Sequence, residues 1–197
     1  MAVAVEHEKR RKKILEKALA VFMDDGFEDA TFQKIADRCG ITRTILYLYF
    51  KNKREIFNYS IKQLLLNVEE KIHTIFNDKS LGSIEKITKI LLSIIKQLEQ
   101  NRQILSVVLD YLLHIAKGDV DPEARVRRRT VKFRHVLSSM LIAGVKSGEL
   151  KKINIKIATD YLYSFIDSAI FQLVVLKRKS LSELNDAIVF AVKQFAA

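Results

Sequence analysis

Residues 31–57, TFQKIADRCGITRTILYLYFKNKREIF, decide the fold of this chain. Thr31 can cap a first short helix, Gly40 can form a tight turn after it, and Thr42 can cap a second helix. Ala36 is small where two such helices would cross closely. The apolar positions that would seal the crossing are Ile35, Cys39, Ile41 and Leu46. The stretch therefore predicts a helix-turn-helix, whose second helix enters the major groove of DNA.

The second helix combines aromatic rings with unopposed positive charge. No acidic residue lies between Asp37 and Glu55. If residues 42–50 form a helix, Arg43 and Thr44 lie on the side opposite its core face, where they can meet base edges. An arginine there can bind guanine through two hydrogen bonds, and a threonine can contact a thymine methyl. Phosphate contacts are expected from Tyr47, Tyr49, Lys51 and Lys53. The alternative is an aromatic core cluster with a solvated, charged rim.

The same run closely resembles the signature of the TetR family of transcriptional regulators. The matching residues are Thr31, Ile35, Ala36, Gly40, Leu46, Tyr47, Phe50, Lys51 and Lys53, and the likeness extends over residues ~9–57. The resemblance implies a three-helix DNA-binding domain, residues 1–53, followed by a helical effector-binding and dimerisation domain, residues 54–197. It implies DNA contacts by Thr31, Gln33, Thr42, Arg43, Thr44, Tyr47, Tyr49, Lys51 and Lys53. Two positions depart from the family pattern: Gln33 stands where arginine is frequent, and Leu48 where a larger or more polar side chain is frequent.

The composition fits a helical protein that binds an acidic partner. The chain has 197 residues, a formal net charge of +11 and 49% hydrophobic residues. Such a charge favours nucleic acid, an anionic membrane surface or an acidic protein as partner. The single cysteine excludes an internal disulfide and fits a reducing compartment. The sequence shows neither a signal-peptide pattern nor an apolar run long enough for a membrane span, so we expect a cytoplasmic protein. We expect no cofactor and no metal site.

Apolar residues recur at three- and four-residue spacing, which predicts an all-α fold of about nine helices. Gly26 is expected to end the first helix, and Asn52 to open a fourth that runs to about Phe76. The residues expected to precede five further helices are Ser80, Asn101, Asp121, Asn154 and Ser180. A basic run, residues 9–13, lies at the start of the first helix. It can follow phosphates, enter a minor groove, or be a solvated and frayed helix start.

The region after residue 53 is expected to bind an effector and to dimerise. Residues 155–176 are apolar around much of a helix, which must then be buried on both sides. The resemblance implies that the last two helices, about 155–178 and 181–196, form the interface of a two-fold dimer. The expected interface residues are Tyr163, Ile166, Ile170, Leu173, Val174, Ile188 and Val192. An apolar or amphipathic small molecule is the expected effector, and the candidate residues for binding it are Tyr111, His114, Phe133 and Phe165.

Together with these observations, the resemblance implies a one-component repressor that binds a palindromic operator as a dimer and is released by its effector. Two rivals remain at this point. One is a basic protein that binds nucleic acid or a membrane surface without sequence preference. The other is a helical enzyme that uses Asp110 and His114, which stand one helical turn apart. Catalysis has little other support, because the sequence contains neither a Gly-rich phosphate loop nor a His-Glu-x-x-His motif.

Overall fold

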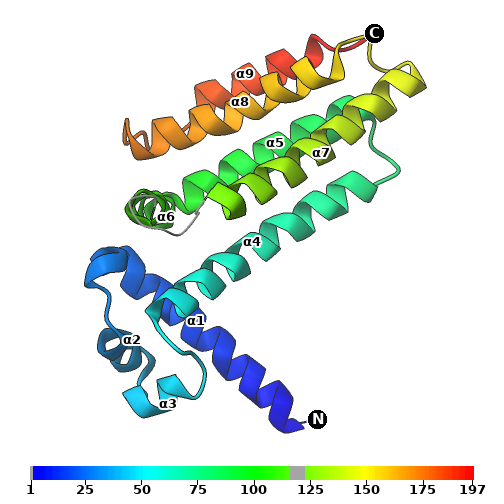
Figure 1. The fold of residues 1–197 in the computed structure, drawn as a ribbon. Coiled ribbons are helices and arrows are strands. Elements are labelled where there is room, and N and C mark those ends of the chain that lie inside the picture. Colours follow the sequence, from blue (N-terminus) through cyan, green and yellow to red (C-terminus); the bar gives the residue numbers. More distant parts are fainter. Residues whose placement is uncertain (1, 116–122) are drawn as a thin grey trace. The chain divides into compact units, whose positions relative to one another are not determined.

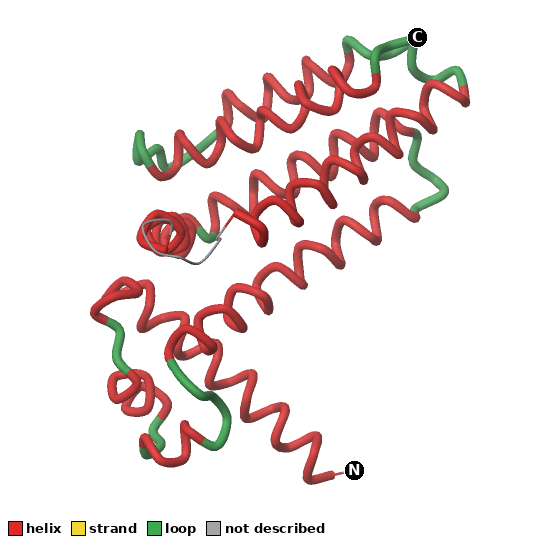
Figure 2. The backbone as a smooth tube through the Cα atoms, viewed as in Figure 1, coloured by secondary structure: helices red, strands yellow, loops and turns green. Residues whose placement is uncertain are grey.

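The computed structural model describes the backbone of residues 2–115 and 123–197, and the side chains of residues 5–113 and 130–197. The described part of the chain is all-α, as predicted, and holds nine helices joined by short connections (Figures 1 and 2). The helices are α1 (Ala2–Asp29), α2 (Phe32–Cys39), α3 (Arg43–Tyr47), α4 (Lys53–Asn77), α5 (Ser83–Gln100), α6 (Arg102–Ile115), α7 (Glu123–Ser147), α8 (Ile155–Val174) and α9 (Ser182–Lys193).

The helices form two compact units. Unit 1 comprises Met1–Asn67 and Ser106–Leu113, and unit 2 comprises Val68–Leu105 and His114–Ala197. Helices α4 and α6 each contribute residues to both units. The functional division at residue 53 stays a prediction.

Unit 1 is organised by one apolar row on α1. Ile14, Ala18 and Phe22 recur at helical spacing and are buried. Gly26 interrupts the helix with φ 77°, a left-handed conformation that glycine adopts at low cost, so the expected break falls at the predicted residue. Phe22 packs edge-on against Phe57 of α4, with ring centroids 4.9 Å apart. This contact joins α1 to α4 in the core of unit 1.

Helix α4 begins with two reciprocal caps. The Asn52 side chain accepts a hydrogen bond from the Glu55 amide at 2.9 Å, and the Glu55 carboxylate accepts one from the Lys51 amide at 2.6 Å. The arrangement is close to a capping box, and it satisfies backbone donors that a helix start otherwise leaves unpaired. The predicted start of α4 at Asn52 is confirmed.

Unit 2 is built around α5, which packs against α7, α8 and α9. Figure 1 shows α5 beside α7 and α8 beside α9. The core of unit 2 contains Ile87, Leu91, Leu141, Leu162 and Ile188, all fully buried.

Two helix starts in unit 2 differ from the sequence expectation. Helix α5 follows Gly82 rather than Ser80, and its first amides, on Ser83 and Ile84, donate to the Glu149 carboxylate at 2.6 and 3.0 Å. Helix α9 has Leu181 at its cap position, and the Leu181 amide donates to Glu99 at 2.6 Å. Both caps come from elsewhere in the fold.

The other expected helix starts can be judged individually. Asn154 caps α8 by accepting from the Ile157 amide, as predicted. Asn101 directly precedes α6. Asp121 lies outside the described residues.

Candidate DNA interface

The helix-turn-helix is formed by α2 and α3, and local hydrogen bonds set its geometry. Thr31 accepts a hydrogen bond from the Lys34 amide at 3.1 Å, and Thr42 accepts one from the Ile45 amide at 3.2 Å. Gly40 takes the left-handed conformation, φ 69°, and its amide donates to the Asp37 carbonyl. The three predicted turn and cap residues therefore act as expected.

Buried side chains seal the crossing between the two helices. Ile35, Ala36 and Leu46 are fully buried. Cys39 is half-buried, and burial raises the pKa of its thiol despite the nearby Lys17 ammonium. Helix α3 is shorter than the expected span of 42–50, because regular helix ends at Tyr47 and the chain turns through Leu48 and Tyr49.

The outer face of α3 carries the predicted base-reading residues in the open. Thr42, Arg43 and Thr44 are exposed, and Tyr47 is 50% exposed. The Arg43 guanidinium donates to the Tyr47 hydroxyl at 3.0 Å and lies over the ring. The Tyr47 ring packs at 4.5 Å on Phe32 of α2. Arg43 is thus held at the surface by a partner that is itself anchored to the core.

Leu48 follows these residues and is 75% exposed. An apolar side chain so exposed on this face can contact a thymine methyl group. In the sequence, Leu48 stands out only as a departure from the family pattern.

The expected phosphate-binding residues have different surroundings. Lys51 is exposed, whereas Tyr49 is half-buried and stacks on His7 of α1 with ring centroids 4.5 Å apart. Lys53 is half-buried, and its ammonium donates to the carbonyls of Phe27 and Glu28 at 2.9 and 2.7 Å. Two of the three ammonium protons of Lys53 are therefore engaged inside the unit.

The start of α2 is exposed as well. Thr31 serves as the helix cap, and the Gln33 side-chain amide donates to Asp37 at 2.7 Å. Both side chains are exposed at the end of α2 that lies away from the Gly40 turn.

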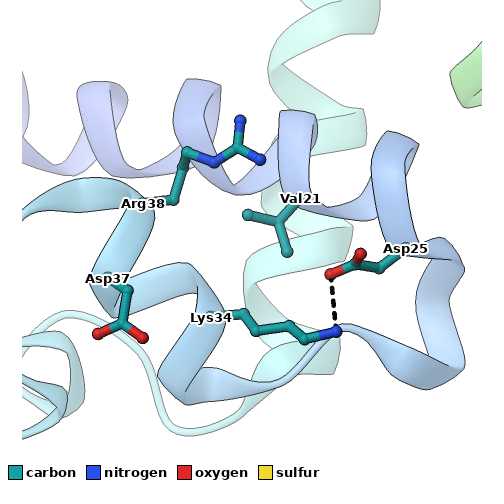
Figure 3. A pocket seen from close by; sticks show the side chains of 5 residues that line it. All are labelled: Val21, Asp25, Lys34, Asp37 and Arg38. Carbon is teal, nitrogen blue, oxygen red and sulfur yellow. Dashed lines mark ion pairs between the residues drawn. The ribbon is translucent and has the colours of Figure 1, made fainter.

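Ion pairs on the other side of α2 tie it to α1 around a shallow surface hollow lined by Val21, Asp25, Lys34, Asp37 and Arg38. Lys34 pairs with Asp25 at 3.1 Å, which Figure 3 shows. Arg38 pairs with Asp24 at 2.7 Å. Exposed pairs of this kind add little stability, about 0–1 kcal/mol each, but they neutralise two cations of the domain.

The residues suggested for effector binding belong to both units. Tyr111 is buried in unit 1, against Phe27 and Phe57 at centroid distances of 4.4 and 4.8 Å. Phe133 and Phe165 belong to unit 2 and pack, partly buried, on its core. The side chain of His114 lies outside the described residues, and so does any pairing with Asp110. Their role in effector binding stays a prediction.

The residues suggested for the dimer interface are mostly interior to unit 2. Ile166, Leu173, Ile188 and Val192 are buried there, and Tyr163, Ile170 and Val174 are partly buried. The exposed apolar side chains of α8, its C-terminal end and α9 are a different set: Ile157, Tyr161, Phe171, Val175, Leu176 and Phe190. Helical periodicity alone could not separate the two sets, because apolar residues surround most of α8.

Two further features are absent from the described residues, a cluster of metal ligands and a membrane-spanning helix. No three His, Cys, Asp or Glu side chains among them are grouped so that they could hold a metal ion. None of the helices, over the same part of the chain, is long and apolar enough to cross a membrane.

Both the helix-turn-helix and the chain as a whole resemble known proteins. Residues 14–59 match the family model described as "Bacterial regulatory proteins, tetR family". The chain is 22% identical over 168 residues to a fatty acid metabolism regulator protein of Bacillus subtilis, covering 85% of this chain and 84% of the relative.

Solved structures of regulators share the fold over nearly the whole chain. A TetR transcription regulator from Haloarcula marismortui superposes with a TM-score of 0.80 at 19% identity, over 96% of this chain and 100% of the other. The regulator FadR from Bacillus subtilis, in complex with stearoyl-CoA, superposes with a TM-score of 0.72 at 19% identity, over 94% and 97% of the two chains. Residues 14–59 therefore match the helix-turn-helix of the TetR family of bacterial regulatory proteins, and the chain as a whole shares the fold of these solved regulators.

Proposed function

We propose that the protein is a one-component transcriptional repressor that binds a palindromic operator as a homodimer and is released by a small-molecule effector. The observation that carries the proposal is the outer face of α3, where Thr42, Arg43, Thr44 and Tyr47 are exposed together on a helix whose opposite side is sealed by Leu46. The protein is expected to act in the cytoplasm, where chromosomal DNA is accessible.

In this proposal Arg43 reads sequence and its neighbours position the duplex. The guanidinium turns from the Tyr47 hydroxyl to the O6 and N7 atoms of a guanine, a contact worth about 1–3 kcal/mol of discrimination. Tyr47, Tyr49 and Lys51 bind phosphates, which fix the register but carry no sequence information. Thr31 and Gln33, exposed at the start of α2, are placed to bind the adjacent backbone.

The dimer is proposed to form through the exposed apolar residues of α8 and α9. Ile157, Tyr161 and Phe171 are exposed at helical spacing on α8, Val175 follows its last residue, and Phe190 is 67% exposed on α9. Several large apolar side chains exposed on neighbouring helices are typical of an interface rather than of a surface that stays in water. Two-fold symmetry then presents two reading heads to half-sites about 34–36 Å apart, or a multiple of that distance.

The effector is proposed to be amphipathic, with a long apolar part. Support comes from the fatty acid metabolism regulator among the relatives and from the stearoyl-CoA complex of a protein with the same fold. The apolar interior of unit 2, with Phe133 and Phe165 partly buried on it, is the proposed location of the apolar part. Such a ligand releases DNA only if it binds the DNA-incompetent state more tightly than the competent one.

The test is a selection from fragmented genomic DNA of the source organism at near-physiological salt, followed by sequencing of the retained fragments. The proposal expects an enriched inverted repeat, and stearoyl-CoA or another long-chain acyl-CoA is expected to release it. Arg43→Ala is expected to relax the preference at one base position in each half-site. Uniform retention of all fragments, or an unchanged preference in Arg43→Ala, would contradict specific reading by this helix.

A further inference from the structure

The N-terminal turns of α1 form an extension that the DNA-binding core does not need. Among the described side chains of α1, the first buried one is Ile14, and residues 5–10 are all exposed. The described helix nevertheless begins at Ala2, so about 18 Å of helix precedes Ile14 at about 1.5 Å per residue. In Figure 1 this dark-blue end of α1 leads away from the short helices.

The extension carries five consecutive basic residues, Lys9–Lys13. Lys9, Lys12 and Lys13 follow helical spacing of three and four residues, and their side chains are exposed. None of the ion pairs or side-chain hydrogen bonds among the described residues engages these three ammonium groups. They form a stripe of free positive charge.

The opposite stripe of the extension holds it in one orientation. His7, Arg11, Ile14 and Ala18 succeed one another at spacings of four, three and four residues, so the core row of α1 continues outward through His7 and Arg11. Arg11 lies 4.2 Å from the Tyr59 ring centroid and 5.2 Å from that of Phe50, which is a cation–π arrangement. The extension is therefore docked on its own unit and is not a frayed helix start.

His7 also connects the extension to the candidate DNA interface. Its ring stacks on Tyr49, with centroids 4.5 Å apart and planes at 20°. Tyr49 directly follows the exposed Tyr47 and Leu48 of the reading segment. The extension therefore lies beside the residue that follows the reading segment.

The groove dimensions decide how such an extension can bind DNA. An α-helix with its side chains is about 10–12 Å across, whereas the minor groove of B-DNA is about 6 Å wide. A helical residue 9–13 segment cannot enter that groove. Its lysines can reach only the phosphates along the groove edge, and contacts of that kind are independent of sequence.

We propose that Lys9, Lys12 and Lys13 form a second DNA-binding site, which takes the backbone phosphates that flank each operator half-site. The inference rests on the proposed function, because α3 must first place the duplex. It lengthens the contacted DNA beyond the inverted repeat and adds affinity without adding specificity.

The experiment compares two duplexes carrying the selected inverted repeat, one with about ten flanking base pairs on each side and one trimmed to the repeat. The arm variant is Lys9→Gln/Lys12→Gln/Lys13→Gln. The charge-matched control is Lys79→Gln/Lys151→Gln/Lys152→Gln, which changes three exposed lysines of unit 2. Glutamine is a good helix former, and circular dichroism checks that the helix content is unchanged.

We expect the wild type and the control to bind the long duplex more tightly than the trimmed one, and the arm variant to bind both alike. Each phosphate contact contributes about −0.9 to the slope of log K against log salt, so the arm variant should have a slope shallower by about 2–5 for a dimer with two arms. His7→Ala should keep the affinity for the trimmed duplex and lose part of the advantage of the flanks.

Three results would overturn the inference: an arm variant that keeps the flank advantage, an arm variant with the slope of the wild type, or wild-type affinity that depends on the base sequence of the flanks. Failure of the proposed function looks different, because the wild type would then prefer no inverted repeat. In that case the salt slopes of the arm variant and the control, measured on random duplex, still decide whether the lysines contact phosphate.

Discussion

The Lys53 ammonium donates to the backbone carbonyl of Phe27 at 2.9 Å and lies 4.8 Å from the centroid of the same ring. It also binds the Glu28 carbonyl. These carbonyls follow the break at Gly26, so the lysine at the start of α4 joins that helix to the end of α1. A residue that the sequence marks as a phosphate contact thereby acquires a second, structural role.

Replacing Lys53 with methionine should therefore destabilise the fold as well as weaken DNA binding. Hydrogen bonds to charged groups are worth about 1.5–3 kcal/mol, and for a half-buried lysine we expect a loss of about 1–2 kcal/mol in the free energy of unfolding. Urea denaturation measures it. Lys51→Met is the matched control, because Lys51 is exposed; it should weaken DNA binding and change stability by less than about 0.5 kcal/mol. Equal free energies of unfolding for Lys53→Met and Lys51→Met would contradict a structural role of Lys53.

Sequence-based prediction succeeded where the deciding contacts are local. The caps by Thr31, Thr42 and Asn154, and the turn at Gly40, each involve residues three or four positions apart. Periodicity likewise identified the helices, since the four-residue spacing of apolar residues such as Ile14, Ala18 and Phe22 can be read directly from the sequence.

The features that the sequence could not predict depend on residues far apart in the chain. Glu149 caps α5 from 66 residues away, and Glu99 caps the start of α9 from 82 residues away. The packing of Tyr111 on Phe27 and Phe57 likewise joins residues that are far apart in the sequence. Nothing in the local pattern of a helix reports such partners.

The Tyr47 hydroxyl should matter for DNA binding and not for folding. Tyr47→Phe removes the acceptor that holds the Arg43 guanidinium but keeps the ring on Phe32. Because the hydroxyl is proposed to bind phosphate once Arg43 has turned to a base, we expect operator affinity to fall by about 0.5–1.5 kcal/mol, the worth of that one hydrogen bond, with the melting temperature unchanged. A fluorescence anisotropy titration that gives Tyr47→Phe the operator affinity of the wild type would exclude the role.

Stability should depend on pH through Glu149. Burial tends to raise the pKa of this carboxyl, but hydrogen bonds from Ile84 and Ser83 outweigh it, and the pKa lies below its ordinary value. A depressed pKa in the folded state means that the carboxylate stabilises the fold above the ordinary pKa, about 4.5, and that this contribution is lost as the pH falls through the lower folded value.

Glu149→Gln should therefore cost about 1–2 kcal/mol at pH 7, as loss of a helix N-cap does, and progressively less below pH 4.5, where the wild-type carboxylate is itself becoming protonated. Thermal unfolding of both proteins between pH 3 and pH 7 measures the difference. Glu183→Gln, on an exposed carboxylate of α9, controls for the loss of one negative charge. A constant gap between Glu149→Gln and the wild type across this range would show that the cap does not titrate.

The oligomeric state should depend on Phe171, which is 54% exposed on α8. The other face of this helix packs in the core of unit 2. Phe171→Glu places a charge in the proposed two-fold interface, where symmetry brings two copies of the carboxylate into one desolvated surface. We expect the variant to sediment as a monomer at concentrations at which the wild type is a dimer. Val131→Glu makes the same change at a residue of α7 that is 59% exposed, and it should stay dimeric. A monomer holds only one α3 reading helix, so Phe171→Glu should also lose the preference for an inverted repeat over a single half-site. If the variant stays dimeric and keeps that preference, the dimer interface lies elsewhere.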